Sequence, residues 1–143
     1  MEQDRREEMR LEMDSLSENE EFARVVVAVF FSRLNPTLEE IDDVKTAVSE
    51  AVTNAVIHGY RGGRGTIFIR AAILGRELTV EVEDKGAGIA DVKKAMEPMF
   101  TTDPSGERSG MGFSFMEAFM DEVEVVSAPG QGTKVIMKKR IGA

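Results

Sequence analysis

The feature that most constrains the fold of this chain is a long amphipathic segment between Thr37 and Gly59. Thr37 and Glu40 form a capping box directly after Asn35-Pro36, which predicts the first turn of a helix. Gly59 predicts where that helix ends. Between these signals, apolar residues recur at helical spacing: Ile41, Val44, Val48, Val52, Ala55 and Val56. A helix with one apolar face must bury that face against a second layer of structure.

Alternating apolar and polar residues predict a sheet as that second layer. A hairpin ending at Asp84 is expected, because two alternating runs flank the turn Gly75-Arg76. The apolar residues of these runs are Ile67, Ile69, Ala71 and Ile73, then Leu78, Val80 and Val82. Residues 123–127 and 133–140 predict another hairpin around the turn 129–132. Near the N-terminus, Met9, Leu11 and Met13 predict a short edge strand after a frayed segment over residues 1–8.

The remaining segments predict helices and a loop. The first helix is expected from a capping box at Ser17 and Glu20 to about Leu34. It is apolar on nearly every side, so it is either deeply buried or meets another protein through one face. Short helices are expected over residues 91–97 and 111–120, and residues 103–110 have the composition of a mobile lid.

These elements together predict an α+β fold. We expect a two-layer α/β sandwich in which one mixed, mostly antiparallel sheet lies under a helical layer. A length of 143 residues favours a single domain over residues 1–143.

Composition excludes several classes of function. The chain has no cysteine and one histidine, which excludes disulfides, thiolate metal sites and multi-histidine metal sites. It contains no run of eighteen apolar residues, and its first residues lack the apolar core of a signal peptide, so we expect a cytoplasmic protein without a membrane partner. A net charge of −8 disfavours direct binding to nucleic acid.

Three polar residues lie on one side of the long helix at intervals of four. Glu50, Asn54 and His58 occupy these positions beside the apolar stripe. A carboxylate can accept a proton, and an amide oxygen one turn later can ligate a hard cation, which suits a magnesium–nucleotide site. Taken alone, the same spacing is also typical of a solvated helix edge.

Two glycine-rich segments supply the loops that such a site needs. Asp84-Lys-Gly-Ala-Gly88 follows a strand, and its aspartate can accept a hydrogen bond from an exocyclic amine such as that of adenine. Ser109-Gly-Met-Gly-Phe113 opens a helix, where backbone N–H groups can hold phosphate oxygens. Each segment alone is equally compatible with an ordinary turn.

Together these motifs resemble those of a known family. Glu50-x-x-x-Asn54, Asp84-x-Gly-x-Gly88, Gly110-x-Gly112 and Gly132-Thr133 look like the conserved boxes of the GHKL ATPase/kinase superfamily, which folds as a Bergerat sandwich. Residues 49–60, 100–102 and 107–113 resemble the anti-sigma factor serine kinases within it, and the sporulation branch most closely.

The resemblance implies a specific activity. Such proteins form homodimers, bind a sigma factor (here of the sigma-F type), and use Mg-ATP to phosphorylate a serine of an anti-anti-sigma protein, releasing ADP. Glu50 would be the general base and Asn54 the magnesium ligand. The ATP-binding residues implied are Asn54, Asp84, Gly86, Gly88, Thr101, Thr102, Ser109, Gly110, Met111, Gly112, Phe113 and Thr133. The partner-binding residues implied are Glu20, Arg24, Thr53 and Arg108.

Alternative functions remain open at this point. The chain could be a nucleotide-dependent sigma-binding module without phosphotransfer, in which case a base at Glu50 would be unnecessary. It could also belong to the stress-response branch of the same kinases. An ATP-driven clamp is disfavoured, because 143 residues leave no room for a transducer domain. His58 is expected to be a packed residue near the helix end.

Overall fold

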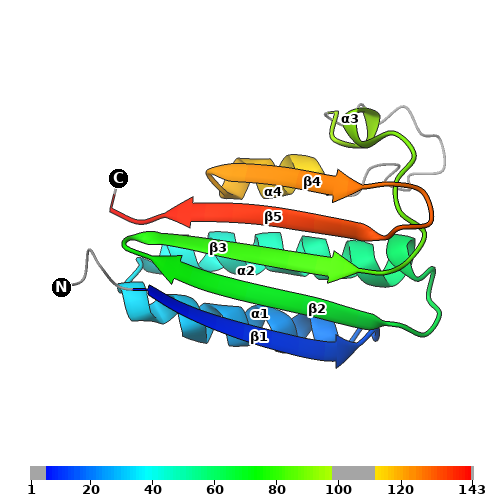
Figure 1. The fold of residues 1–143 in the computed structure, drawn as a ribbon. Helices are drawn as coiled ribbons and strands as arrows, with labels where there is room; N and C mark the ends of the chain where they lie inside the picture. Colours follow the sequence, from blue (N-terminus) through cyan, green and yellow to red (C-terminus); the bar gives the residue numbers. More distant parts are fainter. Residues whose placement is uncertain (1–5, 98–111, 143) are drawn as a thin grey trace.

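The centre of the molecule is a five-stranded sheet with the order β1-β2-β3-β5-β4 (Figure 1). The computed structural model describes residues 6–97 and 112–142. The strands are β1 (Arg6–Asp14), β2 (Thr66–Leu74), β3 (Glu77–Asp84), β4 (Glu122–Ser127) and β5 (Thr133–Arg140). Every neighbouring pair is antiparallel. The parallel component of the expected mixed sheet is therefore absent from the described strands. β3 and β4 run in the same direction, but β5 lies between them and pairs with both.

Three helices form a second layer on one face of this sheet (Figure 1): α1 (Asn19–Phe31), α2 (Leu38–Asn54) and α4 (Phe113–Phe119). The short α3 (Val92–Ala95) lies beyond the β4 edge of the sheet. α1 and α4 each pack against α2. The expected α+β sandwich and the expected order of elements are confirmed.

The core lies between the two layers, where the predicted apolar stripe meets the predicted strand faces. On α2, the buried residues are Val44, Ala47, Val48, Ala51 and Val52. On β2 and β3, they are Ile67, Ile69, Ala71, Ile73, Leu78, Val80 and Val82. The helical spacing of α2 and the alternation in β2 and β3 therefore predicted correctly which faces are buried. Burial of this apolar surface is the main favourable term in folding.

The long helix begins as predicted. The Thr37 side chain accepts a hydrogen bond from the Glu40 backbone N–H, and the Glu40 carboxylate accepts one from the Thr37 N–H. After Asn54 the helix widens into a π-helical turn over Ala55–Gly59, which ends at the predicted glycine. Such turns occur frequently at functional sites.

The first helix differs from the prediction at its start. The capping box expected at Ser17 and Glu20 is wrong, because the N-cap is Glu18 and no side chain caps this end. Instead, the Asn19 side-chain amide donates to the Asp14 carbonyl and ties the helix start to the end of β1. The helix ends at Phe31, and a 3-10 turn over Ser32–Leu34 continues it to the expected boundary.

One face of α1 is buried and the opposite face is exposed. Its buried residues are Ala23, Val27, Phe30 and Phe31. Phe22 and Val29 are 53% and 60% exposed, and Val25 is exposed beside them. Of the two interpretations of this apolar helix, deep burial on all sides is therefore wrong.

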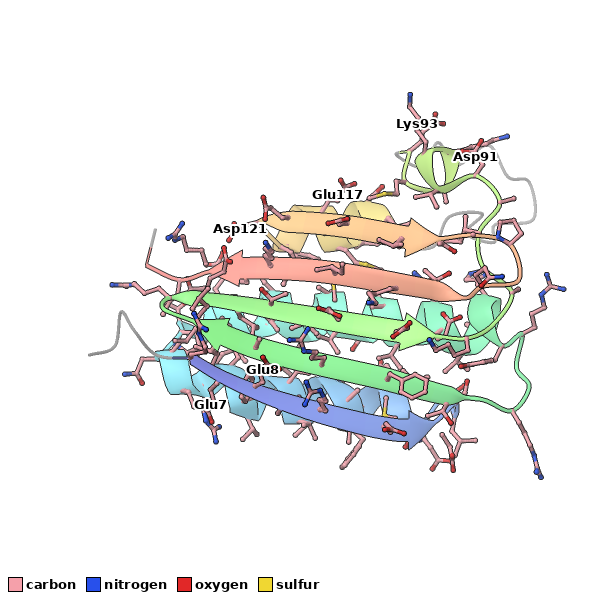
Figure 2. All side chains as sticks on the ribbon, viewed as in Figure 1. Glu7, Glu8, Asp91, Lys93, Glu117 and Asp121 are labelled. Atoms are coloured by element: carbon pink, nitrogen blue, oxygen red, sulfur yellow. The ribbon has the colours of Figure 1, made fainter. Side chains whose placement is uncertain are left out.

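The edge strand β1 is longer than expected, so the predicted fraying of residues 6–8 is wrong. Arg6, Glu7 and Glu8 pair with the end of β2. Ion pairs also hold this end of β1, where Figure 2 labels Glu7 and Glu8. Glu7 lies 2.8 Å from Arg33 of the turn after α1, and Glu8 lies 3.1 Å from Arg70 of β2. Residues 1–5 lie outside the described part of the chain.

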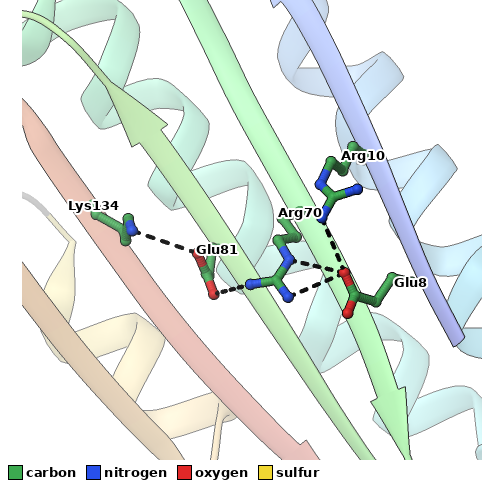
Figure 3. Close-up of polar contacts among 5 residues, drawn as sticks. All are labelled: Glu8, Arg10, Arg70, Glu81 and Lys134. Carbon is green, nitrogen blue, oxygen red and sulfur yellow. Dashed lines mark hydrogen bonds and ion pairs between the residues drawn. The ribbon is translucent and has the colours of Figure 1, made fainter. Parts of the chain in front are cut away.

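Charged side chains cover part of the sheet face opposite the helices. Glu8, Arg70, Glu81 and Lys134 follow one another across β1, β2, β3 and β5, with N–O distances of 3.1, 3.2 and 3.8 Å (Figure 3). Arg10 also pairs with Glu8 at 3.4 Å. Exposed pairs contribute little stability each, but they keep this face of the sheet polar.

Two short helices are near their expected positions. α3 lies within residues 91–97, and the Asp91 side chain caps it by accepting from the Lys94 N–H at 3.0 Å. α4 begins at Phe113 rather than Met111, with Gly112 as N-cap. Met111 lies outside the described residues.

Candidate nucleotide site

A hollow lies where the C-terminal end of α2 meets the end of β3 and the start of β5. Figure 1 shows that these parts of the chain lie at the same end of the sheet. Five residues of the predicted ATP site line it: Asn54, Asp84, Gly88, Phe113 and Thr133. The other lining residues are Ala51, Ala55, His58, Gly59, Val82, Ile89 and Val135. Apolar walls with a few polar groups are typical of a site for a flat, mostly apolar ring. The fold therefore brings the helix motif and the first glycine loop to one place.

Asp84 is the polar group at the base of this hollow. Its side chain is almost fully buried, at 4% exposed, and Oδ1 accepts a hydrogen bond from the Gly86 N–H at 2.9 Å. Burial raises the pKa of this carboxyl group, while hydrogen bonds from the Gly86 and Thr133 backbones oppose that shift. A buried acceptor of this kind can select a ligand that presents an N–H group.

Glycines are required where backbones pass close to Asp84. A Cβ atom at Gly59 would lie 2.6 Å from the Asp84 carboxyl carbon, and a Cβ atom at Gly86 would overlap the Gly59 carbonyl. Gly88 has φ of 76°, and a side chain there would overlap the Ala128 carbonyl. Gly59 was predicted only to end the helix. Its contact with Asp84 is a second role that spacing along the sequence does not reveal.

His58 lines the same hollow and is half-buried. Burial lowers the pKa of its imidazole, which favours the neutral form near neutral pH. This agrees with the interpretation of His58 as a packed residue near the helix end.

The start of α4 lies against the predicted general base. Gly112 has φ of 71°, and a side chain at this position would overlap Glu50 Oε2. Gly112, one of the described residues of the second glycine motif, and the helix carboxylate are therefore in direct proximity, although they are far apart in the sequence. The Phe113 side chain is buried and lines the hollow.

The other predicted ATP-binding residues lie outside the described part of the chain. These are Thr101, Thr102, Ser109, Gly110 and Met111, together with the partner-binding residue Arg108 and the predicted lid over residues 103–110.

Two of the predicted partner-binding residues lie together on α1. Arg24 Nε is 3.8 Å from Glu20 Oε2, one helical turn away. Both are close in sequence to the exposed Phe22, Val25 and Val29. Thr53 is half-buried on α2, next to Asn54.

Among residues 6–97 and 112–142, no group of three acidic or histidine side chains is placed to hold a metal ion. In the same residues, no helix is both long and apolar enough to cross a membrane.

The family model described as "Histidine kinase-like ATPase domain" matches residues 14–139, so the chain has a kinase-type ATPase domain, a class of domain that binds a nucleotide. Solved structures agree on the fold. The RsbU and RsbW domains of Rv1364c from Mycobacterium tuberculosis align with a TM-score of 0.68 at 22% identity, over 94% of this chain and 32% of that one. The catalytic domain of histidine kinase ThkA aligns with a TM-score of 0.59 at 17% identity, over 93% and 98% of the two chains.

Curated relatives narrow the family further. An anti-sigma F factor of Clostridium acetobutylicum is 61% identical over 132 residues, which is 92% of either chain. One from Thermoanaerobacter sp. is 58% identical over 135 residues, or 94% of either chain. The chain belongs to the family of the anti-sigma F factors.

Proposed function

We propose that this protein binds a sigma factor of the sigma-F type and withholds it from RNA polymerase. The name shared by its relatives supports this proposal, as does the exposed apolar face of α1. Glu20 and Arg24 would form the charged rim of that contact. Thr53 and Arg108 are proposed as further contacts of partner proteins.

The second part of the proposal is serine kinase activity toward a small anti-anti-sigma protein. The observation that carries it is the proximity of Gly112 to the Glu50 carboxylate at the start of α4. In the proposed reaction, the serine oxygen bonds to the γ-phosphorus of ATP, the bond from that phosphorus to the bridging oxygen breaks, and ADP leaves. Glu50 would accept the serine proton, which makes the oxygen a better nucleophile.

The residues around the hollow fit Mg-ATP. Asp84 would accept a hydrogen bond from the adenine amine, and Gly86, Gly88 and Thr133 would let the base approach. Magnesium, when bound, would draw charge from the phosphates. Since it keeps most of its water and phosphate ligands, one amide oxygen from Asn54 suffices, and a cage of carboxylates is unnecessary.

The proposal also covers the assembly and place of action that the family resemblance implies. We propose one domain that forms a homodimer in the cytoplasm, where a sigma factor works. Sedimentation equilibrium would give the mass of the free protein and test the dimer.

Phosphotransfer is tested with labelled ATP, magnesium and a candidate anti-anti-sigma protein. Wild-type protein should label a serine of that partner, and Glu50→Ala should reduce the rate by roughly 10²- to 10⁴-fold. ATP and sigma-factor affinities should be retained in the variant. Asp42→Asn is a matched control, because Asp42 is an exposed carboxylate on the same helix. Near-normal labelling by Glu50→Ala would assign the base elsewhere, and no labelling by wild type with normal sigma binding would favour a non-catalytic module.

A further inference from the structure

The loop between Asp84 and Ile89 is fastened at both ends by side-chain hydroxyl groups that lie outside the hollow. At its start, the Tyr60 hydroxyl accepts the Lys85 N–H at 2.7 Å and donates to the Thr66 carbonyl at 2.6 Å. The Tyr60 ring packs against Gly65, where a side chain would overlap it. One phenol group therefore links the end of α2, the start of β2 and the loop after β3.

At the other end of the loop, the Ser127 hydroxyl forms a similar pair of hydrogen bonds. Its Oγ accepts the Ile89 N–H at 2.8 Å and donates to the Gly132 carbonyl, also at 2.8 Å. The Thr133 hydroxyl lies 2.9 Å from the same oxygen. Ser127 is the last residue of β4, so it ties the loop to the turn between β4 and β5.

Backbone contacts hold the middle of the loop. The Ala87 N–H donates to the Gly59 carbonyl at 2.8 Å, and the Gly130 N–H donates to the Ala87 carbonyl at 2.7 Å. The Gly86 N–H donates to Asp84. The N–H groups of residues 85, 86, 87 and 89 are thus all used within the protein. The loop consequently offers a ligand a preformed shape and the Asp84 acceptor, rather than a set of backbone donors.

We infer that Tyr60 and Ser127 are positioning residues for recognition of the nucleotide base, acting through Asp84 and the loop backbone. Neither residue is among those that line the hollow, so neither is placed to recognise the base directly. Their hydroxyl groups hold the loop in its binding conformation before the ligand arrives, which lowers the cost of ordering it on binding. This inference rests on the proposed nucleotide site and adds the residues that hold its adenine-selective acceptor in place.

The test uses Tyr60→Phe, which keeps the ring against Gly65 and removes only the hydroxyl, and Ser127→Ala at the other end. Ser32→Ala is the control, because the Ser32 hydroxyl donates to the Val29 carbonyl at the end of α1. Calorimetry with magnesium would give the affinities for ATP and for GTP. GTP carries a carbonyl where adenine has its amine, so correct placement of Asp84 favours ATP alone.

Each loop variant loses one hydrogen bond to the loop itself, from the Lys85 or the Ile89 N–H, and should therefore bind ATP about 3- to 10-fold more weakly. The ratio of ATP to GTP affinity should fall by a similar factor, whereas Ser32→Ala should leave both values unchanged. A general loss of stability would lower the melting temperature but would not change this ratio. In an Asp84→Asn background, Tyr60→Phe should change the ratio by less than about 2-fold, because the acceptor it positions is already altered.

Two results would overturn the inference. One is an unchanged ATP-to-GTP ratio in both loop variants. The other is full additivity of Tyr60→Phe with Asp84→Asn. If the wild-type protein itself fails to bind ATP, both the proposed nucleotide site and this inference are refuted. If the wild type binds ATP normally and the loop variants keep its ATP-to-GTP affinity ratio, only the inference is refuted.

Discussion

Replacing Asp84 by asparagine should lower the affinity for ATP without a parallel loss of fold stability. The side chain is buried, and Oδ1 accepts the Gly86 N–H at 2.9 Å. Asparagine has the same shape, and its amide oxygen can keep that hydrogen bond. Its amide nitrogen, however, presents donors to the hollow, where the adenine amine also presents a donor.

The size of the binding effect follows from the hydrogen bond that is lost. A hydrogen bond to a charged group contributes about 1.5–3 kcal/mol, so ATP affinity should fall roughly 10- to 150-fold. The free energy of unfolding should not fall with it. Burial raises the pKa of Asp84, which means that the folded protein disfavours the charged carboxylate that asparagine replaces by a neutral group.

The pH dependence of fold stability and of ATP affinity gives an independent test of this reasoning. Because burial raises the pKa of Asp84 in the folded protein above its usual value of 3.8, the folded state binds the proton more tightly than the unfolded state. The contribution of Asp84 to the free energy of unfolding is therefore greatest below pH 3.8 and decreases as pH rises to the folded pKa. ATP binding has the opposite trend, since it needs the ionised acceptor and should weaken as pH falls through the folded pKa. Asp84→Asn should remove both trends.

Urea denaturation and calorimetry between pH 4 and 8 would measure these quantities in wild type and variant. The reasoning would be refuted if Asp84→Asn bound ATP as tightly as wild type. It would also be refuted if the variant lost more than about 3 kcal/mol of unfolding free energy at pH 7, since the removed charge is disfavoured and the hydrogen bond from the Thr133 backbone is the most that asparagine gives up.

Three further substitutions test other parts of the molecule. Asn54→Ala should weaken ATP binding about tenfold with magnesium present and little without it, because one hard-cation ligand is lost; equal calorimetric affinities for Mg-ATP would exclude Asn54 as a ligand. Arg24→Glu should reduce sigma-factor binding in a pull-down at least tenfold while ATP affinity is retained, and unchanged sigma binding would place the contact elsewhere. Lys139 donates to Asp43 at 3.2 Å and to the Phe119 carbonyl at 2.7 Å, so Lys139→Met should lower the unfolding free energy by about 1–3 kcal/mol in urea; a stable variant would show that water replaces both bonds.

Local patterns in the sequence determined most of the elements of this fold. The long helix, its capping box at Thr37 and its end at Gly59 were predicted because cap chemistry and helical spacing involve residues within a few positions of one another. Both hairpins were predicted for the same reason. The family motif also identified Asp84 and Asn54, which do line one hollow.

Only the tertiary structure decided which of these elements meet. The insertion of β5 between β3 and β4 made the sheet antiparallel, and pairing with β2 ordered Glu7 and Glu8 at the start of β1. The capping box expected at Ser17 failed because a contact from Asn19 to β1 determines the start of α1 instead.

The site shows the same division between sequence and structure. Gly59 contacts Asp84 across 25 positions, and Ser127 holds Ile89 across 38. Spacing along the chain carries no signal for such contacts, because they depend on how the helix layer and the sheet pack together. The sequence therefore determined which groups are available for the chemistry, while packing between distant segments determined how the loop that presents Asp84 is held in place.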